Sequence, residues 1–232
     1  SANNAVFGFT GGTLRFGALS GAGKTFGGGS VVVEVGHLGT ACASSINLQS
    51  TGKTLRKVGA GGFVFSGANY SGLDLAGGFF TPVYPSSVPA SLLVFSGGTF
   101  LYPTGLTTDA SALIRNSSAP ITISDLDGRV RTFATALDSS NTGGLVKKGP
   151  GTLALSAIPA YAGSTVIESG TLSVPPGTVF ETLALSNSAA LAFPADAPVF
   201  TNGATVTLCT YASRAGAALR SEEHTSELQS LT

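Results

Sequence analysis

The chain contains two stretches of nearly the same sequence, Leu55-Arg-Lys-Val-Gly-Ala-Gly-Gly-Phe-Val-Phe-Ser66 and Leu145-Val-Lys-Lys-Gly-Pro-Gly-Thr-Leu-Ala-Leu-Ser156. In each copy a lysine precedes a glycine-rich turn, and a strand of alternating apolar residues comes after that turn. A duplicated unit of a turn and a strand is typical of repeat proteins, in which each copy buries its apolar face against its neighbour. The sequence therefore predicts an array of similar units.

The alignment of the two copies pairs similar residues at matching positions, which predicts that they have the same structural role in each copy. It pairs Lys57 with Lys147, Phe63 with Leu153, Phe65 with Leu155 and, after one inserted residue, Tyr70 with Tyr161. The paired phenylalanines and leucines alternate with a period of two, so we expect all four to point into a common core. We interpret the repeated tyrosines as structural caps on a corner.

The rest of the chain reads as short strands separated by turns. Runs of four to eight residues are broken by Gly, Asn, Ser or Pro, and the chain has 32 glycines among 232 residues. A Gly-Thr-Leu phrase recurs at residues 12–14, 151–153 and 170–172, where glycine suits a corner and threonine begins a strand. Stacked coils with such corners form a parallel β-helix, and at roughly 20–30 residues per coil we expect about eight to ten coils.

The second copy also carries a family resemblance. Gly143-Gly-Leu-Val-Lys-Lys-Gly-Pro-Gly-Thr-Leu-Ala-Leu-Ser156, followed by Tyr161-Ala-Gly-Ser-Thr-Val-Ile-Glu-Ser-Gly-Thr-Leu-Ser-Val174, resembles the autotransporter-associated β-strand repeat. Ala157 stands where that family prefers glycine, and the first copy is weaker because Gly62 occupies the threonine position. The resemblance implies an all-β, right-handed parallel β-helix of the pectin-lyase-like type, within the passenger region of an exported bacterial protein.

We divide the chain into three parts. Residues 1–212 are predicted to form the β-solenoid, with repeat copies near 55–72 and 143–174, and residues 213–219 form a tail. Residues 220–232 read Arg-Ser-Glu-Glu-His-Thr-Ser-Glu-Leu-Gln-Ser-Leu-Thr, which resembles the in-frame translation of a sequencing adapter and is excluded from the fold. Because the chain begins with Ser1 and contains no Met, we expect it to be an internal fragment.

Two further features affect the expected outline of the solenoid. Phe80–Pro89 contains three prolines and is predicted to be a loop ejected from the coil stack. Cys42 and Cys209 lie far apart in sequence, so we expect two free, packed thiols.

One segment matches the phosphate-loop pattern in relaxed form. Ala18-Leu-Ser-Gly-Ala-Gly-Lys24-Thr25 has alanine for the first glycine, and a second glycine run and the strand Val31–Val35 come after it where a helix would be needed. We therefore expect no nucleotide binding. The formal net charge is zero and no basic cluster exceeds Lys147-Lys148, so nucleic acid is not expected as a partner either.

Four charged residues are the main candidates for chemistry. If residues 121–133 form one strand, Asp125, Asp127, Arg129 and Arg131 share one outer face, as in β-helices that cleave polysaccharides, with Leu126 and Val130 on the other. Asp125-Leu-Asp127-Gly128 also resembles part of a calcium loop, although position 136 is Ala where such a loop needs Glu. The alternative is a solvated face or polar turn stabilised by neighbouring opposite charges.

Other catalytic arrangements have little support in the sequence. His37 is the only histidine before the adapter-like tail, and it stands between glycines, which predicts a corner with an exposed imidazole. We therefore assign no catalytic, cofactor-binding or metal site, expect no cofactor, and expect that the chain is not an enzyme.

Three hypotheses of function arise from these features. The first is a structural, surface-display segment of an exported autotransporter-like passenger, at the surface of a Gram-negative-type bacterium or outside it, whose full-length protein includes an outer-membrane translocator domain. The second is a β-helical polysaccharide lyase or hydrolase, based on residues 125–131. The third is an adhesin whose loop around Phe80–Pro89 contacts a carbohydrate or a protein ligand.

The adapter interpretation gives a first test. If residues 220–232 are foreign to the fold, deleting them leaves the melting temperature of the protein unchanged within experimental error. A clear loss of thermal stability in the truncated chain would show that this segment packs against the body.

Overall fold

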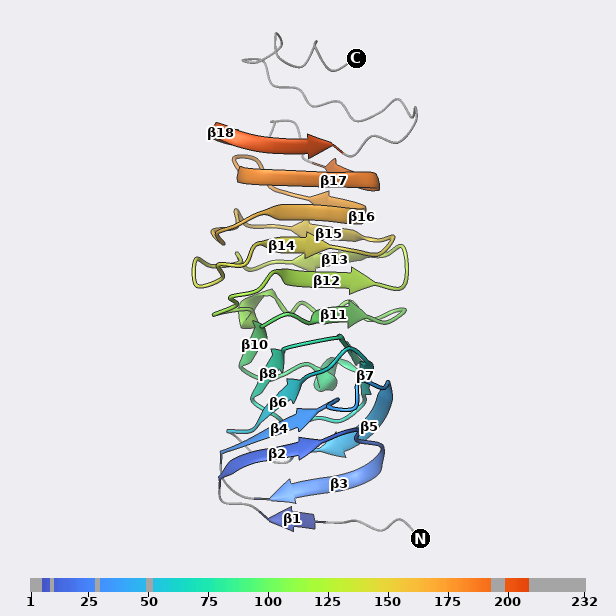
Figure 1. Ribbon diagram of the computed structural model, residues 1–232. Coiled ribbons are helices and arrows are strands. Elements are labelled where there is room, and N and C mark those ends of the chain that lie inside the picture. Colours follow the sequence, from blue (N-terminus) through green and yellow to red (C-terminus); the bar gives the residue numbers. More distant parts are fainter. Residues whose placement is uncertain (1–5, 9–10, 28–29, 49–51, 193–198, 209–232) are drawn as a thin grey trace.

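The protein is a β-solenoid of about eight turns, as a computed structural model shows. The structure describes residues 6–8, 11–27, 30–48, 52–192 and 199–208. Figure 1 shows the strands stacked along a rod, from the N-terminal end at the bottom to β18 near the top. The parallel β-helical architecture predicted from the repeats is therefore confirmed, with a coil count at the lower end of the expected range.

The first half of the rod has two walls of parallel strands. The smaller sheet has five strands, in the order β10-β8-β6-β4-β2. They are β2 (Gly12–Phe16), β4 (Val31–Val35), β6 (Thr54–Lys57), β8 (Gly72–Leu75) and β10 (Leu92–Phe95). Successive strands alternate between this sheet and the main one, so each coil contributes one strand to each wall.

The main sheet has thirteen strands and runs the length of the described rod. Its first nine members are β1 (Val6–Gly8), β3 (Gly21–Gly27), β5 (Cys42–Asn47), β7 (Gly62–Phe65), β9 (Phe79–Pro82), β11 (Thr99–Tyr102), β12 (Ile121–Asp125), β14 (Leu145–Lys147) and β16 (Thr165–Ser173). The remaining four are β13 (Val130–Phe133), β15 (Thr152–Leu155), β17 (Val179–Ala192) and β18 (Val199–Leu208).

The cross-section of the rod changes near its middle. The smaller sheet ends at β10, and beyond it a single bridge joins Leu93 to Ile114. A new wall then starts at β13, which pairs with β15, and β15 pairs with the second half of β16. The long strands β16 and β17 continue around the corner and belong to both walls, with a register shift at the bend between Ile167 and Ser169.

The four apolar residues that the repeat alignment singled out all point inward, as predicted. Phe63, Phe65, Leu153 and Leu155 are buried, and Leu153 has no exposed surface. Burial of this kind supplies the main driving force for stacking coils, because a single coil has no second layer of its own.

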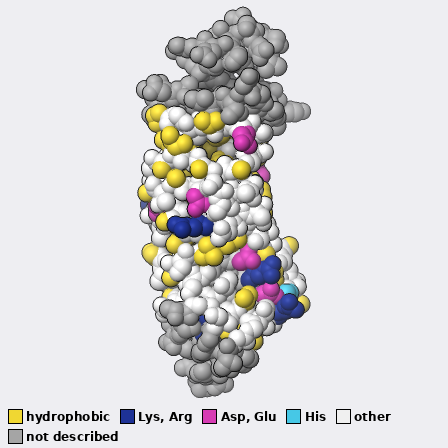
Figure 2. Space-filling view, turned by 90° about the vertical axis from the view of Figure 1, so that its left-hand side faces the viewer, with side chains coloured by type: hydrophobic (Ala, Val, Ile, Leu, Met, Phe, Trp, Pro, Cys, Tyr) yellow, Lys and Arg dark blue, Asp and Glu magenta, His cyan; other side chains and the backbone are white. Residues whose placement is uncertain are grey.

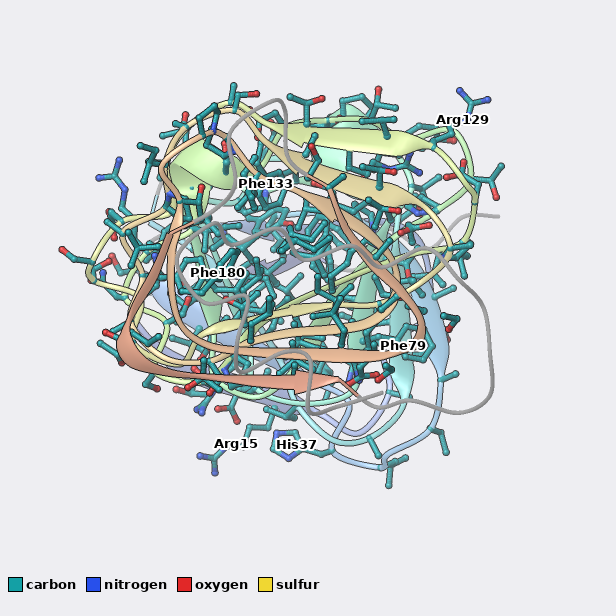
Figure 3. The ribbon with its side chains drawn as sticks, turned by 90° about the horizontal axis from the view of Figure 1, so that it is seen from above. Arg15, His37, Phe79, Arg129, Phe133 and Phe180 are labelled. Atoms are coloured by element: carbon teal, nitrogen blue, oxygen red, sulfur yellow. The ribbon has the colours of Figure 1, made fainter. Side chains whose placement is uncertain are left out.

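An aromatic stack fills the core in the first half of the rod. Neighbouring rings have centroids 4.9 to 6.1 Å apart, in tilted or edge-on arrangements that suit the quadrupoles of the rings. The stack consists of Phe63, Phe65, Tyr70, Phe80, Phe100 and Tyr102. Figure 3 shows that Phe133 and Phe180 likewise point into the interior of the second half.

The two repeat copies lie on different walls of the solenoid. The lysine-bearing strand is β6 of the smaller sheet in the first copy and β14 of the main sheet in the second. Tracing the register from Phe63 through Phe80, Phe100 and Ile123 leads to Lys147, and not to the aligned Leu153. The repeat is therefore a local unit of strand, corner and strand, and it does not mark a whole number of coils.

The predicted loop at Phe80–Pro89 is wrong in its first part. Residues 79–82 form β9, which pairs with β7 and β11, and Phe80 is fully buried. Pro82 is tolerated because it is the last residue of the strand, where its missing N–H matters least. The chain leaves the strand only afterwards, through the short 3₁₀ helix η1 (Pro85–Ser87); a second one, η2, spans Ser111–Leu113.

Within the described residues, no helix has the length and apolar character needed to cross a membrane. The predicted boundaries at 212 and 219 and the adapter-like segment 220–232 lie outside the described residues.

Because the core is closed, shortening one of its side chains should lower the free energy of unfolding. Leu153→Ala should lower the free energy of unfolding by about 2–5 kcal/mol, because it leaves a cavity between stacked coils. Urea denaturation measures this loss, and the exposed Val130 on the neighbouring strand supplies the control, since Val130→Ala should change stability by less than about 0.5 kcal/mol. Equal effects of the two substitutions would contradict the inward orientation of Leu153.

Candidate functional site

Each repeat copy turns its corner at a glycine that no other residue could replace. Gly59 and Gly149 have φ angles of 70° and 81°, in the left-handed region. A Cβ atom at Gly59 would lie 2.1 Å from the carbonyl oxygen of Gly36, and one at Gly149 would lie 2.3 Å from that of Asp125. The corners of adjacent coils therefore stack with their backbones in direct contact.

Lys57 places its ammonium group inside this stack of corners. The residue has no exposed surface, and its Nζ donates to the carbonyl oxygens of Val58 (2.5 Å), Gly59 (2.9 Å) and Gly77 (3.2 Å). Val58 and Gly59 belong to its own corner, whereas Gly77 belongs to the corner of the next coil. The side chain thus satisfies carbonyl groups that the strand ladders leave unpaired at the bend.

Lys147 repeats this arrangement and adds an acidic partner. Its Nζ donates to the carbonyl oxygens of Lys148 (2.6 Å), Gly149 (2.8 Å) and, in the next coil, Ser169 (3.4 Å). It also donates to Oδ2 of Asp125 in the preceding coil, at 2.9 Å, and Asp125 Oδ1 accepts the backbone N–H of Gly151 at 2.8 Å. One ammonium group therefore joins three successive coils.

Burial lowers the pKa of both lysines. For Lys147 the hydrogen bond and the charge of Asp125 act in the opposite direction, whereas no such carboxylate faces Lys57 among the described contacts. Apart from charge compensation the two corners are alike. We call them the lysine corners, defined by Lys57 with Gly59 and by Lys147 with Gly149.

The four charged residues proposed for polysaccharide chemistry do not share an outer face. β12 ends at Asp125 and β13 begins at Val130, so residues 121–133 are two strands on two walls. Asp125 and Arg131 are buried, and Leu126 and Val130, expected on the opposite face, are exposed by 59% and 55%. The single-strand prediction is therefore wrong, because a corner interrupts it at residues 126–129.

Two members of this group, Asp125 and Arg131, lie in the interior of the rod, whereas Arg129 is exposed at the corner. Arg131 lies over the ring of Tyr102, with its guanidinium carbon 5.3 Å from the ring centroid, and its Nη2 contacts Oδ1 of Asp127 at 2.5 Å. Asp127 also accepts the N–H of Gly105, and Arg129 pairs with it at 3.2 Å. In the part of the chain that is described, no three His, Cys, Asp or Glu residues come together to hold a metal ion.

The phosphate-loop segment forms a strand. Lys24 and Thr25 lie within β3, which pairs with β1 and β5, so the helix that this motif needs after its lysine is replaced by a strand.

An alternating charge ladder runs along the outside of the smaller sheet. Arg15, Glu34, Arg56 and Asp74 are register neighbours on β2, β4, β6 and β8. Glu34 is paired with Arg15 (2.8 Å) and Arg56 (3.1 Å), Arg56 with Asp74 (3.0 Å), and the exposed His37, as predicted for its imidazole, lies 3.1 Å from Glu34. Figure 2 shows these acidic and basic side chains gathered beside the imidazole.

The repeated tyrosines are engaged in local hydrogen bonds at corners. The buried Tyr70 hydroxyl donates to the carbonyl oxygen of Ser87 at 2.7 Å, and that of Tyr161 shares a hydrogen bond of 2.6 Å with Thr165 Oγ1. Both geometries agree with the interpretation as structural caps. Cys42 is a free thiol packed against the core, and Cys209 lies outside the described residues.

One known family has a sequence model that matches the two parts of the chain that carry the lysine corners. Residues 55–79 and 145–174 match the model of the passenger-associated-transport-repeat. Both segments are autotransporter passenger repeats. Their matched boundaries begin at Leu55 of β6 and Leu145 of β14, directly before each corner. No curated protein and no solved structure matches the chain.

The passenger repeat implies an exported protein, at the cell surface or outside the cell. The repeated lysine of the two copies is visible in the alignment, but its role is not, because lysine is ordinarily a solvent-exposed residue. The signal that could have revealed the role is its position, two residues before the first glycine of a Gly-x-Gly corner in both copies.

Replacing the lysine with methionine should lower the free energy of unfolding by a different amount at each lysine corner. Lys57→Met should lower the free energy of unfolding by about 1–3 kcal/mol, since it leaves corner carbonyl groups without donors. Lys147→Met should cost about 3–5 kcal/mol, because it also leaves the Asp125 carboxylate buried and unpaired. Urea denaturation of both variants measures the difference.

Two controls accompany these variants. Lys148→Met removes a partly exposed lysine paired with Glu168 and should change stability by less than about 0.5 kcal/mol. Adding Asp125→Asn to Lys147→Met should recover part of the loss. If Lys147→Met is no more destabilising than Lys148→Met, the lysine corners are not structural.

The charge ladder predicts an acid dependence. Burial raises the pKa of Glu34, but hydrogen bonds from Arg15 and His37 outweigh it, so the pKa lies below its ordinary value of 4.5. A carboxyl whose pKa is depressed on folding stabilises the fold above its unfolded value and loses that contribution as the pH falls through its folded value. Glu34→Gln should therefore flatten the fall in unfolding free energy below about pH 4.5.

Proposed function

We propose that this chain is a structural segment of a surface-displayed autotransporter passenger and has no chemistry of its own. Its role is to extend the passenger as a rod, to present loops or a tip, and to assist export by folding outside the cell. The full-length protein would then carry an outer-membrane translocator domain of the Gram-negative type. The observation that supports this proposal most directly is the lysine corner, found in both passenger repeats.

The lysine corners suit a segment that folds during export. Each ammonium group binds carbonyl oxygens of its own coil and of the next, so its hydrogen bonds are complete only when the neighbouring coil has stacked. Each of these two coils thereby favours the addition of the next one, as expected for a solenoid whose stability is a sum of nearest-neighbour terms. Folding of this kind can proceed progressively as the chain emerges.

The enzyme alternative loses the observation on which it was based. It required Asp125, Asp127, Arg129 and Arg131 on one outer face, and the structure divides them between a buried ion pair, a buried cation–π contact and an exposed corner.

Export of coil-deletion variants tests the structural role. The chain is placed between a secretion signal and an outer-membrane translocator barrel, and its surface display is measured by protease accessibility on intact cells. Deleting residues 81–100 joins Phe80 to Leu101 in the register of the present ladder, since Phe80 and Phe100 are register partners, and it leaves both lysine corners in place. This one-coil deletion should reach the surface at the level of the intact chain, because a rod tolerates a change in coil number.

Deleting residues 81–90 supplies the matched control. It removes about half a coil, so the strands after the deletion would meet the wrong wall of the preceding coil. This variant should therefore lose both folding and display. Equal display of the two deletion variants would contradict a role that depends on coil stacking.

A further inference from the structure

Two exposed asparagines stand at bends where the backbone is left-handed. In the described part of the chain, Asn69 and Asn116 are the only residues other than glycine with positive φ angles, of 63° and 59°. Asparagine is one of the few residues with a side chain that visits this region routinely. Each of the two also begins an Asn-x-Ser triplet, since residues 69–71 read Asn-Tyr-Ser and residues 116–118 read Asn-Ser-Ser.

This triplet is the acceptor motif for N-linked glycosylation, in which a sugar is joined to the side-chain amide of the asparagine. The motif has this meaning in exported proteins and on their surface. The passenger repeat supplies the first condition, because it implies an exported protein. The second condition depends on how each triplet lies in the fold, and there the two triplets differ.

The triplet at residues 116–118 presents both of its functional groups to solvent. Asn116 is exposed, and its backbone N–H donates to Ser140 Oγ at 2.8 Å, while its side-chain amide has no hydrogen-bond partner among the described residues. Ser118 is exposed as well, and within the same part of the structure its hydroxyl is not engaged either. An enzyme can therefore reach the amide and the hydroxyl without breaking a contact of the fold.

The central residue of this triplet holds it in place. Ser117 is fully buried, and its Oγ accepts the backbone N–H of Phe95 in the preceding coil at 3.1 Å. Its own backbone N–H donates to Oδ1 of Asn141 in the next coil at 3.2 Å. The bend is thus fixed to both neighbouring coils through Ser117, and a group attached to the asparagine beside it would not disturb these bonds.

The triplet at residues 69–71 is engaged with the neighbouring coil. Its serine, Ser71, is half-buried, and the hydroxyl oxygen accepts the backbone N–H of Gly52 at 2.8 Å. Its central residue, Tyr70, is buried and bonded to Ser87. An enzyme that must bind the serine hydroxyl would have to open this bend first, so Asn69 is the poorer acceptor in the folded rod.

From this contrast we propose that Asn116 is an acceptor site for N-linked glycosylation by a hexose. Nδ2 of Asn116 forms a bond to C1 of the hexose of a nucleotide-activated donor, and the bond between C1 and the diphosphate oxygen breaks. The nucleoside diphosphate leaves, and the amide nitrogen gives up one proton to a base of the transferase. The site uses no residue of the lysine corners, so it is independent of the structural role.

Enzymatic transfer to the folded chain tests the site. The purified intact chain is incubated with UDP-glucose and a bacterial N-glycosyltransferase that recognises Asn-x-Ser/Thr, and peptide mass spectrometry measures the hexose on each asparagine. Transfer to Asn116 should be about tenfold faster than transfer to Asn69, because the second bend must first open locally. Two synthetic peptides that contain the triplets should react at similar rates, and the chain modified at Asn116 should keep the melting temperature of the unmodified chain.

Two variants of the serine separate the motif from the bend. Ser118→Ala destroys the motif but keeps asparagine at the left-handed position, so it should abolish transfer to Asn116 and leave the melting temperature unchanged. Ser118→Thr should retain transfer. The proposal is overturned if the folded chain takes no hexose at Asn116, if transfer survives Ser118→Ala, or if modification of Asn116 lowers the melting temperature. Equal rates at the two asparagines in the folded chain, or a difference that persists in the peptides, would also contradict it.

Discussion

The rod depends on the pairing of backbone carbonyl groups at the corners where its strands change direction. Strand ladders satisfy the backbone only along the walls, and at each bend carbonyl oxygens of stacked coils face one another. In both passenger repeats a buried lysine supplies hydrogen bonds to these oxygens, since one ammonium group can donate to carbonyl oxygens of two coils. The glycines are needed for the same reason, because any Cβ would prevent the corners from coming close enough to be bridged.

The two lysine corners differ in how their charge is balanced. Lys147 is neutralised by Asp125, which is held in turn by the N–H of Gly151, whereas Lys57 relies on carbonyl dipoles. The Asp125 pair lies where the solenoid acquires its new wall, directly after β12 and close to Arg131 on β13. The additional ion pairs there secure a part of the rod in which the smaller sheet has ended and the ladder continues on other strands.

Much of the fold could be predicted because local pattern and burial agree in this chain. The alternation around Phe63 and Leu153 identifies the core face correctly, and the glycine phrases locate true corners. The strand β9 is not predicted because Pro82, Pro85 and Pro89 suggest a loop, although the first of them stands at a strand end. A strand is expected only after each glycine-rich turn, so β6 and β14, which stand before the turns and carry Lys57 and Lys147, are not predicted from the pattern.

The candidate sites were harder to predict, since they depend on contacts between coils that no single-coil pattern encodes. The sequence pattern places Asp125 to Arg131 on one strand because period-2 spacing continues across Gly128, and only the change of wall reveals the corner. The contact between the Phe79 ring and Gly62 likewise joins two neighbouring coils, and it is not visible along the chain.

Native-state hydrogen exchange tests the coupling between coils most directly. If Lys147 joins three successive coils, Lys147→Met should accelerate amide exchange in β12, β14 and β16, while β2, β4, β6 and β8 keep the protection they have in the wild type. Lys57→Met should produce the converse pattern, with loss of protection in β6 and β8. A uniform change along the whole rod, or no change near the substituted corner, would contradict the account.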